Sequence, residues 1–519
     1  MKLKSILTLI AIFLVAFYLR FSSVNHPFWV DEFSTADQAQ IMTQFRSSVF
    51  SQSESYFESH NITTHAIVSL FFNFLGKSEF NSRLPFMIIG SLVPVLVFLF
   101  TRKYLDKSSA WGATLLTTFS YWQITWSQQS RGYMLQQILV LLSIILYFSL
   151  LKSKKKIIPL VLLGITIILG FLTHTTYLLV LVAIIAHHLI FNYRQVLVQL
   201  TQPLFLMVLA VATFIIHNVG LLKNVLAGLQ IILSNGLSNN LWYYHSFLWR
   251  EQTLISFLAI LGIILGLRKV KTRSQVILLS FIIGAYLFFV SFLFAPYVSR
   301  YLLPIFPLLV ILSGMSLSEI AALISKKYQS MVVLLLVLFI VINGDKFTIK
   351  SKAFYSVNHD MREIALIDYD QVYKIIQGKG ELGNGKTAVV DTWPDRIKWY
   401  LGENQDYFYS FRWLDEPGTV NGLEKKTPFE LNKEGEKYIP KTGKPPLKLI
   451  GELSDLELAM AKYQQGFIWI DDSSLPADVI FYVKENFYKE LYLDHYPLDD
   501  NPYSIWPGTL YSWGFEVNN

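Results

Sequence analysis

The chain contains no cysteine, and charged residues are scarce in it. The lack of cysteine excludes disulfide bonds, thiolate catalysis and metal sites with cysteine ligands. Only 16% of the 519 residues are charged, against roughly 25% in soluble domains. Hydrophobic residues make up 53% of the chain and aromatic residues 15%. A water-soluble core does not need this much apolar surface, so the composition predicts a polytopic α-helical membrane protein.

Metal-site spacings, internal repeats and low-complexity segments are also missing from the sequence. No spacing of His, Asp and Glu resembles a zinc signature, so no metal site is predicted. The formal net charge of +7 could point to nucleic acid, but the basic residues fall in short clusters between apolar runs. Such clusters are typical of loops that fix membrane topology, and we expect no nucleic-acid partner.

Apolar stretches recur along the first 344 residues, close to the roughly 20 residues that a helix needs to cross the hydrocarbon. We expect about eleven crossings, over residues 4–22, 83–102, 109–126, 132–151, 157–172, 174–192, 203–219, 253–268, 274–295, 300–318 and 329–343. With this count every basic cluster lies on one side, which the positive-inside rule assigns to the cytoplasm. The N-terminus is then inside and the C-terminus outside a plasma or inner membrane.

One apolar stretch, residues 62–75, is too short for an ordinary crossing. Counted as a crossing, it would move the basic clusters to the outer side. We therefore expect a helix that lies along the outer interface or dips into it, within a long first outer loop over residues 22–82. The alternative is a twelfth span.

The composition changes after Gly344 to charged and polar residues with turn signals. Residues 387–391 and 466–471 are predicted to be buried strands, and 475–489 a following helix. The sequence thus predicts a membrane domain over residues 1–344 and a small extracytoplasmic α/β domain over residues 345–519.

An acidic pair, Asp31-Glu32, follows the first apolar stretch on the outer side. Phe28 and Trp29 precede it and would anchor this stretch at the membrane interface. The plain interpretation is a pair of solvated loop charges, since exposed carboxylates are the norm. The functional interpretation is that these carboxylates act on a substrate whose lipid tail lies in the membrane.

Arginines mark the outer ends of several expected spans: Arg20, Arg83, Arg131 and Arg300. Arginine suits phosphate because its planar fork donates two parallel hydrogen bonds and keeps its proton. The alternative is that each side chain only reaches toward lipid headgroups. His60 and His174 could each donate to a phosphate or form a helix cap.

Four segments in order, 19–36, 78–85, 126–134 and 299–304, resemble the C-type membrane glycosyltransferases. The resemblance is to the branch that contains the protein O-mannosyltransferases and the lipid A aminoarabinose transferase. This branch is similar to glycosyltransferase family 39. The resemblance covers roughly residues 1–345. It implies an enzyme that uses a polyprenyl-phosphate-linked sugar on the outer face of the membrane.

The resemblance also implies roles for particular residues. It makes Asp31 the catalytic base and Glu32 its supporting acid. It leaves His60 a possible phosphate role. With the residue chemistry above, the predicted substrate- and phosphate-binding set on the outer face is His60, Arg83, Arg131, His174, Arg300 and Tyr301. The chain departs from the family at Asn61, where a proline usually follows the residue at position 60. It departs again at Gln129, where related members often carry Glu, and this puts a second acid or a metal role in doubt.

Chemistry agrees with this picture, because transfer from a lipid monophosphate needs a base for the acceptor hydroxyl and donors for the charge on the leaving phosphate. No cofactor is required, and a divalent metal is neither required nor excluded. The main alternative is a transporter or lipid flippase, although inverted repeats and helices broken at mid-membrane are not evident. A membrane anchor for the outer domain is a third. The acceptor, whether lipid, glycan, protein or pigment, leaves no signature.

Overall fold

The computed structural model divides the chain into two compact units. The first comprises Met1–Val24 and Ala39–Glu363, and the second comprises Asn25–Gln38 and Ile364–Asn519. The structure describes residues 3–21, 24, 26–44, 61–153, 156–199, 237–293, 297–349, 367–380, 382, 385–402, 406–412, 414–420, 423–426, 429–439, 446–471, 475–494 and 507–515.

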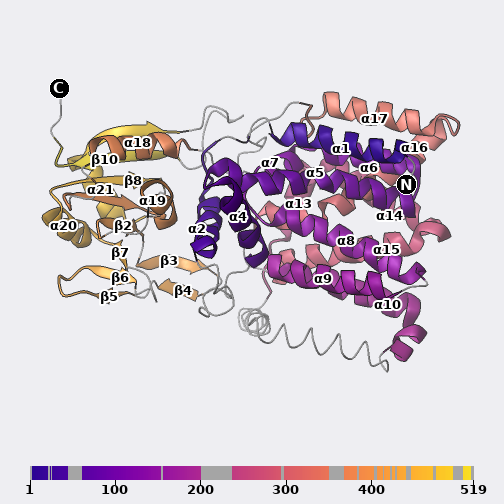
Figure 1. The fold of residues 1–519 in the computed structure, drawn as a ribbon, viewed down its shortest axis with the longest axis horizontal. Helices are drawn as coiled ribbons and strands as arrows, with labels where there is room; N and C mark the ends of the chain where they lie inside the picture. The colour runs from indigo at the N-terminus through magenta and orange to yellow at the C-terminus, as the bar shows by residue number, and fades with distance from the viewer. Residues whose placement is uncertain are drawn as a thin grey trace. The chain divides into compact units, whose positions relative to one another are not determined.

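The first unit is helical, and most of its long helices run alongside one another (Figure 1). Its first half contains α1 (Leu3–Phe21), α4 (Ile62–Leu75), α5 (Glu79–Tyr104), α6 (Lys107–Phe119), α7 (Tyr121–Ser127), α8 (Tyr133–Lys152), α9 (Ile157–Thr173), the 3-10 turn η1 (Thr175–Tyr177) and α10 (Leu178–Gln199). Its second half contains α13 (Leu241–Arg250), α14 (Thr253–Arg268), α15 (Val270–Phe288), the π-turn η2 (Phe289–Leu293), the 3-10 helix η3 (Ser299–Ile305), α16 (Phe306–Ile324) and α17 (Gln329–Asn343).

Five of the described helices are long and apolar enough to cross a membrane, or six if the bent pair α13 and α14 forms one span. The prediction of a polytopic helical membrane protein is confirmed, whereas the number of about eleven crossings stays a prediction. The expected span 203–219 lies outside the described residues. The expected span 109–126 is two helices, because Ser120 ends α6 and accepts a hydrogen bond from the Gln123 amide at the start of α7 (3.5 Å).

Helix α16 is the central helix of this unit, since its side chains are buried almost continuously from Phe306 to Ser318. It packs against α6 and α14. Small residues allow the close approach: a Cβ atom on Gly314 would lie 2.6 Å from the Ala113 nitrogen and the Ser109 oxygen of α6. Without a hydrophobic driving force between helices in lipid, such backbone proximity is a main source of helix association.

Basic turns meet at one end of the helical unit. The Lys103 ammonium near the end of α5 donates to the Ser149 hydroxyl near the end of α8 at 3.3 Å. Ser318 of α16 donates to Asp106, between α5 and α6, at 3.0 Å. The turn between α14 and α15 joins them through an ion pair from Lys269 to α16. The clusters that lie apart in the sequence therefore share one end of the helical unit.

Helix α4 lies at the opposite end and runs crosswise to the neighbouring long helices (Figure 1). The Thr63 hydroxyl donates to the Leu169 carbonyl near the end of α9 (3.4 Å). A Cβ atom on Gly132, just before α8, would lie 2.4 Å from the Thr64 hydroxyl. This short helix thus contacts the ends of α8 and α9, and its place at the outer interface stays a prediction.

The second unit is an α/β domain, as the sequence predicted. Its main sheet has the strand order β5-β6-β7-β2-β1-β8-β10-β9. Neighbours among β7, β2, β1 and β8 are parallel, and the remaining pairs are antiparallel. The strands are β1 (Thr387–Asp391), β2 (Phe408–Phe411), β5 (Glu430–Leu431), β6 (Lys437–Ile439), β7 (Leu447–Ile450), β8 (Gln465–Ile470), β9 (Tyr488–Leu493) and β10 (Gly508–Trp513), with a separate hairpin of β3 (Asp415–Val420) and β4 (Leu423–Lys426).

Helices cover both faces of this sheet. The alternation along β1 and β8 places Val390 and Ile468 in one core with α20 (Leu453–Lys462) and α21 (Ala477–Asn486). Trp469 points to the other face, where it meets Tyr369 of α18 (Tyr369–Lys379) with ring centroids 6.0 Å apart. Helix α19 (Pro394–Leu401) connects β1 to β2.

The start of the first loop also belongs to the second unit. Residues 26–38 pack with the C-terminal domain although more than 300 residues separate them in the chain. Helix α2 (Val30–Gln44) contributes its first turns to this unit and its last turns to the helical unit. At the latter end, the Thr43 hydroxyl lies 2.9 Å from that of Ser69 in α4.

Because Gly314 is fixed by backbone contacts, Gly314→Val should loosen the packing of α16 on α6. Overpacked cores lose about 1–3 kcal/mol, and we expect a clearly lower midpoint of thermal unfolding for the purified protein in detergent. Gly284→Val in α15 is the matched control, since a Cβ atom there meets nothing within 4 Å. Equal midpoints for the two variants would contradict this account of the helix packing.

Candidate functional site

The Arg20 side chain is the centre of a polar cluster at the end of the helical unit opposite the basic turns. It is fully buried at the end of α1. Its Nε donates to the Ser127 hydroxyl of α7 at 3.0 Å, and Nη1 donates to the Ala16 carbonyl at 2.9 Å. The Gln128 amide donates to the Arg20 carbonyl at 3.0 Å. Gly90 of α5 makes room, since a Cβ atom there would lie 2.2 Å from the Ser127 oxygen.

All of these partners of the Arg20 side chain are neutral. Within the described part of the chain, Arg20 forms no ion pair, and its Nη2 has no hydrogen-bond partner in the protein. A buried charge is costly unless another charge compensates it. The guanidinium is therefore suited to binding an anion whose oxygen accepts a hydrogen bond from Nη2.

The segment 123–129, which includes Ser127 and Gln128, also contains buried amides. Gln123 and Gln129 are fully buried, and among the described residues neither the oxygen nor the nitrogen of either amide has a partner in the protein. The side-chain oxygen of Gln128 also has no hydrogen-bond partner among the described residues. Since each buried unpaired polar group costs about 1–3 kcal/mol, this segment has hydrogen-bonding capacity that a polar ligand could satisfy.

Arg83 is the second fully buried arginine, in the second turn of α5. Its Nη1 donates to the Val24 carbonyl at 3.0 Å. The neighbouring Ser82 hydroxyl lies 2.6 Å from that of Ser130. Arg20 and Arg83 are fully buried and do not extend toward lipid headgroups. The interpretation of these two arginines as headgroup anchors is therefore wrong.

An aromatic cluster joins two of the predicted residues. His174 and Tyr301 have ring centroids 6.0 Å apart, and Tyr133 lies 6.4 Å from each of them. His174 also caps η1, because its Nδ1 accepts the Thr176 amide at 3.2 Å. Tyr133 follows the loop that contains Arg131, so two predicted sequence motifs meet in space.

The remaining predicted arginines are partly exposed. Arg131 is half-buried, and its charge acts on His65 of α4. Arg300, also half-buried, lies in η3 between Ser299 and Tyr301. The Ser299 amide donates to the Tyr243 hydroxyl at 3.1 Å, which ties η3 to α13. His60 lies outside the described residues.

The acidic pair forms the first turn of α2, in the second unit. Glu32 is fully buried, and its carboxylate accepts the Trp29 amide at 3.0 Å. This contact fixes the start of the helix. Asp31 is half-buried. The two carboxylates thus differ in environment, and Glu32 has a structural contact that the sequence did not reveal.

A buried triad of charges lies at the carboxyl ends of β1 and β8. Arg396 pairs with Asp391 and, through Nη2 at 2.8 Å, with Asp471, and all three are buried. The Tyr373 hydroxyl donates to Asp391 at 2.5 Å, and the Trp469 indole donates to Asp471 at 2.9 Å. Burial raises the pKa of Asp471, although the Arg396 charge opposes this. Sequence reasoning missed the triad, yet an acid at the end of each buried strand was a visible signal.

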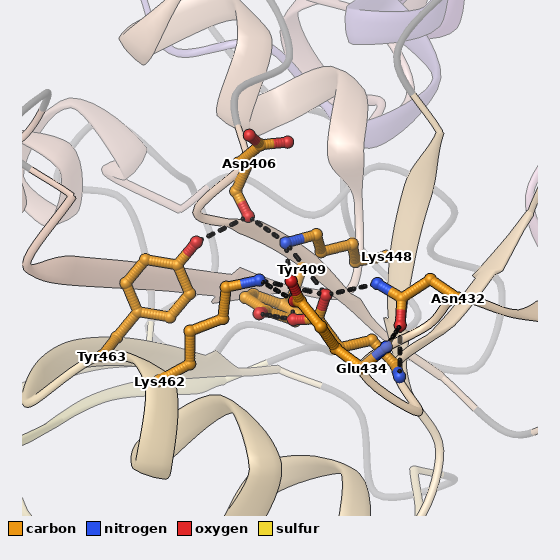
Figure 2. A network of polar contacts seen from close by, with 8 residues as sticks. Asp406, Tyr409, Asn432, Glu434, Lys448, Lys462 and Tyr463 are labelled. Carbon is orange, nitrogen blue, oxygen red and sulfur yellow. Dashed lines mark hydrogen bonds and ion pairs between the residues drawn. The ribbon is translucent and has the colours of Figure 1, made fainter.

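A second buried network, centred on Glu436 before β6, ties together β2, β6 and β7 (Figure 2). Its carboxylate accepts from Tyr409 at 2.6 Å and from Asn432 at 2.8 Å. Lys448 and Lys462 add their charges at 3.3 and 3.2 Å. Burial alone would raise the pKa of Glu436, but these hydrogen bonds and charges lower it to about 2.

The described residues contain no group of three or more His, Asp or Glu side chains that could hold a metal ion. Of the predicted site residues, His174 and Tyr301 lie together, and Arg83 and Arg131 flank the serine pair formed by Ser82 and Ser130. Asp31 and Glu32 belong to the other unit. Of the buried amides of 123–129, sequence reasoning singled out Gln129 alone, as a departure from the family pattern, because no charge marks Gln123 or Gln128.

Comparisons with known proteins agree with the predicted resemblance. Residues 59–219 match the sequence model of a family described as dolichyl-phosphate-mannose-protein mannosyltransferase. No curated protein sequence matches the chain. The fold is similar to that of ArnT from Cupriavidus metallidurans in the apo state, at 11% identity and a TM-score of 0.58, over 98% of each chain. ArnT bound to undecaprenyl phosphate gives a TM-score of 0.60 at 11% identity, over 99% of this chain and 98% of that one.

These findings confirm the resemblance to the ArnT-like, C-type membrane glycosyltransferases. The family pattern covers residues 59–219, and the likeness in fold covers nearly the whole chain. The chain is an integral multi-pass membrane protein with a C-terminal α/β domain.

The Glu436 network should make the C-terminal domain sensitive to acid. The pKa of Glu436 falls from 4.5 to about 2 on folding, so its stabilising effect is complete above pH 4.5 and is lost as pH falls toward 2. Glu436→Gln should lower the thermal midpoint at pH 7, and the gap from the unsubstituted protein should shrink below pH 4.5. Intrinsic fluorescence of the full chain in detergent, recorded during heating at each pH, would measure these thermal midpoints.

Glu434→Gln is the matched control, because Glu434 pairs with the same Lys462 but is 63% exposed. Exposed ion pairs contribute about 0–1 kcal/mol. An equal loss in both variants, or a gap that does not depend on pH, would contradict the role given to Glu436.

Proposed function

We propose that the protein transfers a sugar from a polyprenyl-phosphate-linked donor to an acceptor hydroxyl at the outer face of the membrane. The observation that carries the proposal is the fully buried Arg20, which has only neutral partners among the described residues. The phosphate of a lipid-linked donor is an anion of the kind this guanidinium requires. Family match and fold support the same substrate class.

The orientation follows from charge. The end of the helical unit that gathers the basic turns would face the cytoplasm by the positive-inside rule. The end with Arg20 and the aromatic cluster would then face outward, and the C-terminal domain would be extracytoplasmic. This is also the side on which the acidic pair is expected, with about eleven crossings in total.

The donor phosphate would be held by arginines. We assign this role to Arg20 and Arg83, with Arg131 and Arg300 as outer partners. His60 would contribute a further donor to the phosphate. His174 and Tyr301 would contact the donor's sugar-phosphate group next to Tyr133. Preorganised donors of this kind stabilise charge on a departing phosphate by about 2.7–4 kcal/mol each.

Asp31 would be the base. It removes the proton of the acceptor hydroxyl while that oxygen attacks the anomeric carbon, and the bond from that carbon to the phosphate oxygen breaks with its electrons leaving on the phosphate. Glu32 would support it from its buried position at the start of α2, where it holds the Trp29 amide. The acceptor could be a lipid, a glycan or a protein.

Asp31→Asn keeps the shape of the side chain and removes its basicity. We expect turnover to fall by about 10²–10⁴-fold, the usual contribution of a positioned base, while donor binding survives. The assay follows release of polyprenyl phosphate by mass spectrometry from a panel of polyprenyl-phosphate sugars. Glu32→Gln should cost less. Normal turnover of the folded Asp31→Asn protein would remove Asp31 from the mechanism.

Arg20→Met tests the phosphate site, because it keeps an unbranched side chain in place of the aliphatic part of Arg20 and removes the charge. Hydrogen bonds to charged groups contribute about 1.5–3 kcal/mol, so the affinity for undecaprenyl phosphate should fall roughly 10- to 100-fold. The thermal midpoint without ligand should stay or rise, since an uncompensated buried charge is removed. Arg20→Lys should restore binding only in part.

Arg102→Met is the control for this measurement. Arg102 lies in the last turn of α5, at the end of the helical unit that contains the basic turns, and it is exposed. If Arg20→Met lowers the thermal midpoint and leaves the affinity unchanged, Arg20 is a structural residue and the phosphate assignment is wrong.

A further inference from the structure

The carboxyl edge of the parallel strands in the second unit is a topological switch point. The chain passes from β1 to β2 and β7 on one side of the sheet and returns to β8 on the other side of β1. Open α/β sheets bind their ligands beside the strand ends at such a point. Asp391 and Asp471 stand at these two strand ends, and Arg396 fills the space between them.

Aromatic side chains of the first loop lie over this edge. Tyr369 covers Arg396, with the guanidinium carbon 4.2 Å from the ring centroid. Phe33 packs edge-on against Tyr369, with centroids 5.9 Å apart. Phe28 packs against Trp399 at 4.7 Å and against Phe33 at 5.4 Å. The position where such domains bind a separate ligand thus holds the chain's own residues 26–38.

An ion pair adds to these ring contacts. The Lys398 ammonium lies 3.5 Å from Asp37 and 3.2 Å from Asp395, and the Lys398 side chain is only 8% exposed. Burial would lower the pKa of Lys398, but the two carboxylates raise it. The charge is therefore kept, and it holds α2 one turn beyond the aromatic contacts.

We propose that the C-terminal domain positions the acidic pair for the transfer reaction, with Trp399 and Tyr369 as the positioning residues. The inference rests on the proposed function of Asp31. Phe28 and Phe33 lie on either side of Asp31 in the sequence, and both are buried against the domain. Holding them fixes the first turn of α2, and with it the direction of the Asp31 carboxylate.

A small displacement of a base has a large effect, since about 1 Å can cost 10²-fold in rate. Trp399→Ala should therefore lower kcat roughly 10- to 100-fold and leave the affinity for undecaprenyl phosphate unchanged. Trp399→Phe keeps a ring against Phe28 and should restore most of kcat. Trp393→Ala is the matched control, because Trp393 is in the same domain and is 41% exposed.

Hydrogen exchange of the intact protein in detergent separates positioning from misfolding. In Trp399→Ala, peptides over residues 26–38 should exchange faster, while peptides over β1 and β8 keep their protection. Phe28→Leu removes the same contact from the loop side and should give the same pattern. It serves as the decisive variant if Trp399→Ala also exposes the sheet.

Faster exchange over residues 26–38 with unchanged kcat would overturn the inference, as would unchanged exchange in both variants. A loss of donor affinity equal to the loss of kcat would also overturn it, because positioning of the base does not act on donor binding. Absence of transfer from every donor by the unsubstituted protein is a different result. It would refute the proposed function, whereas the exchange data would still report whether the domain holds the loop.

Discussion

Burial of the Arg20 guanidinium is the interaction on which the end of the helical unit opposite the basic turns depends. Three features of the chain accommodate it: the lack of a side chain at Gly90, the hydroxyl of Ser127, and the break at Ser120 that starts α7 as a separate helix. Its hydrogen-bond acceptors among the described residues are neutral oxygens. A cation in such surroundings is costly, and this cost is reasonable where the structure must receive an anion.

Arg396 shows how the same chain buries a guanidinium for structural purposes. Two carboxylates pair with it, tyrosine and tryptophan donors satisfy those carboxylates, and a Tyr369 ring covers it. Removal of one partner from such a set typically costs about 3–5 kcal/mol. Arg20 and Arg396 are both fully buried. Two carboxylates compensate the charge of Arg396, whereas no charge among the described residues compensates that of Arg20. This difference separates a structural arginine from a candidate ligand-binding one.

Helix α2 is shared between the two units of the chain. Its first turns, with the acidic pair, belong to the C-terminal unit, and its last turns belong to the helical unit. Glu32 and Asp31 are neighbours in sequence, yet one carboxylate is used to fix the helix start and the other is half-buried. The C-terminal domain is thereby more than an appended module, because it packs the segment to which the sequence assigns the chemistry.

The sequence by itself determined the membrane class, most helix positions and two strands of the sheet, because these depend on hydropathy and local periodicity. It also indicated the family resemblance. Only the tertiary structure decided that Arg20 has neutral partners, that His174 meets Tyr301, and that residues 26–38 pack on the C-terminal domain. Apart from the contact of Arg20 with the Ala16 carbonyl, these contacts join residues more than 100 positions apart, and pairing over such distances depends on packing that no local pattern encodes.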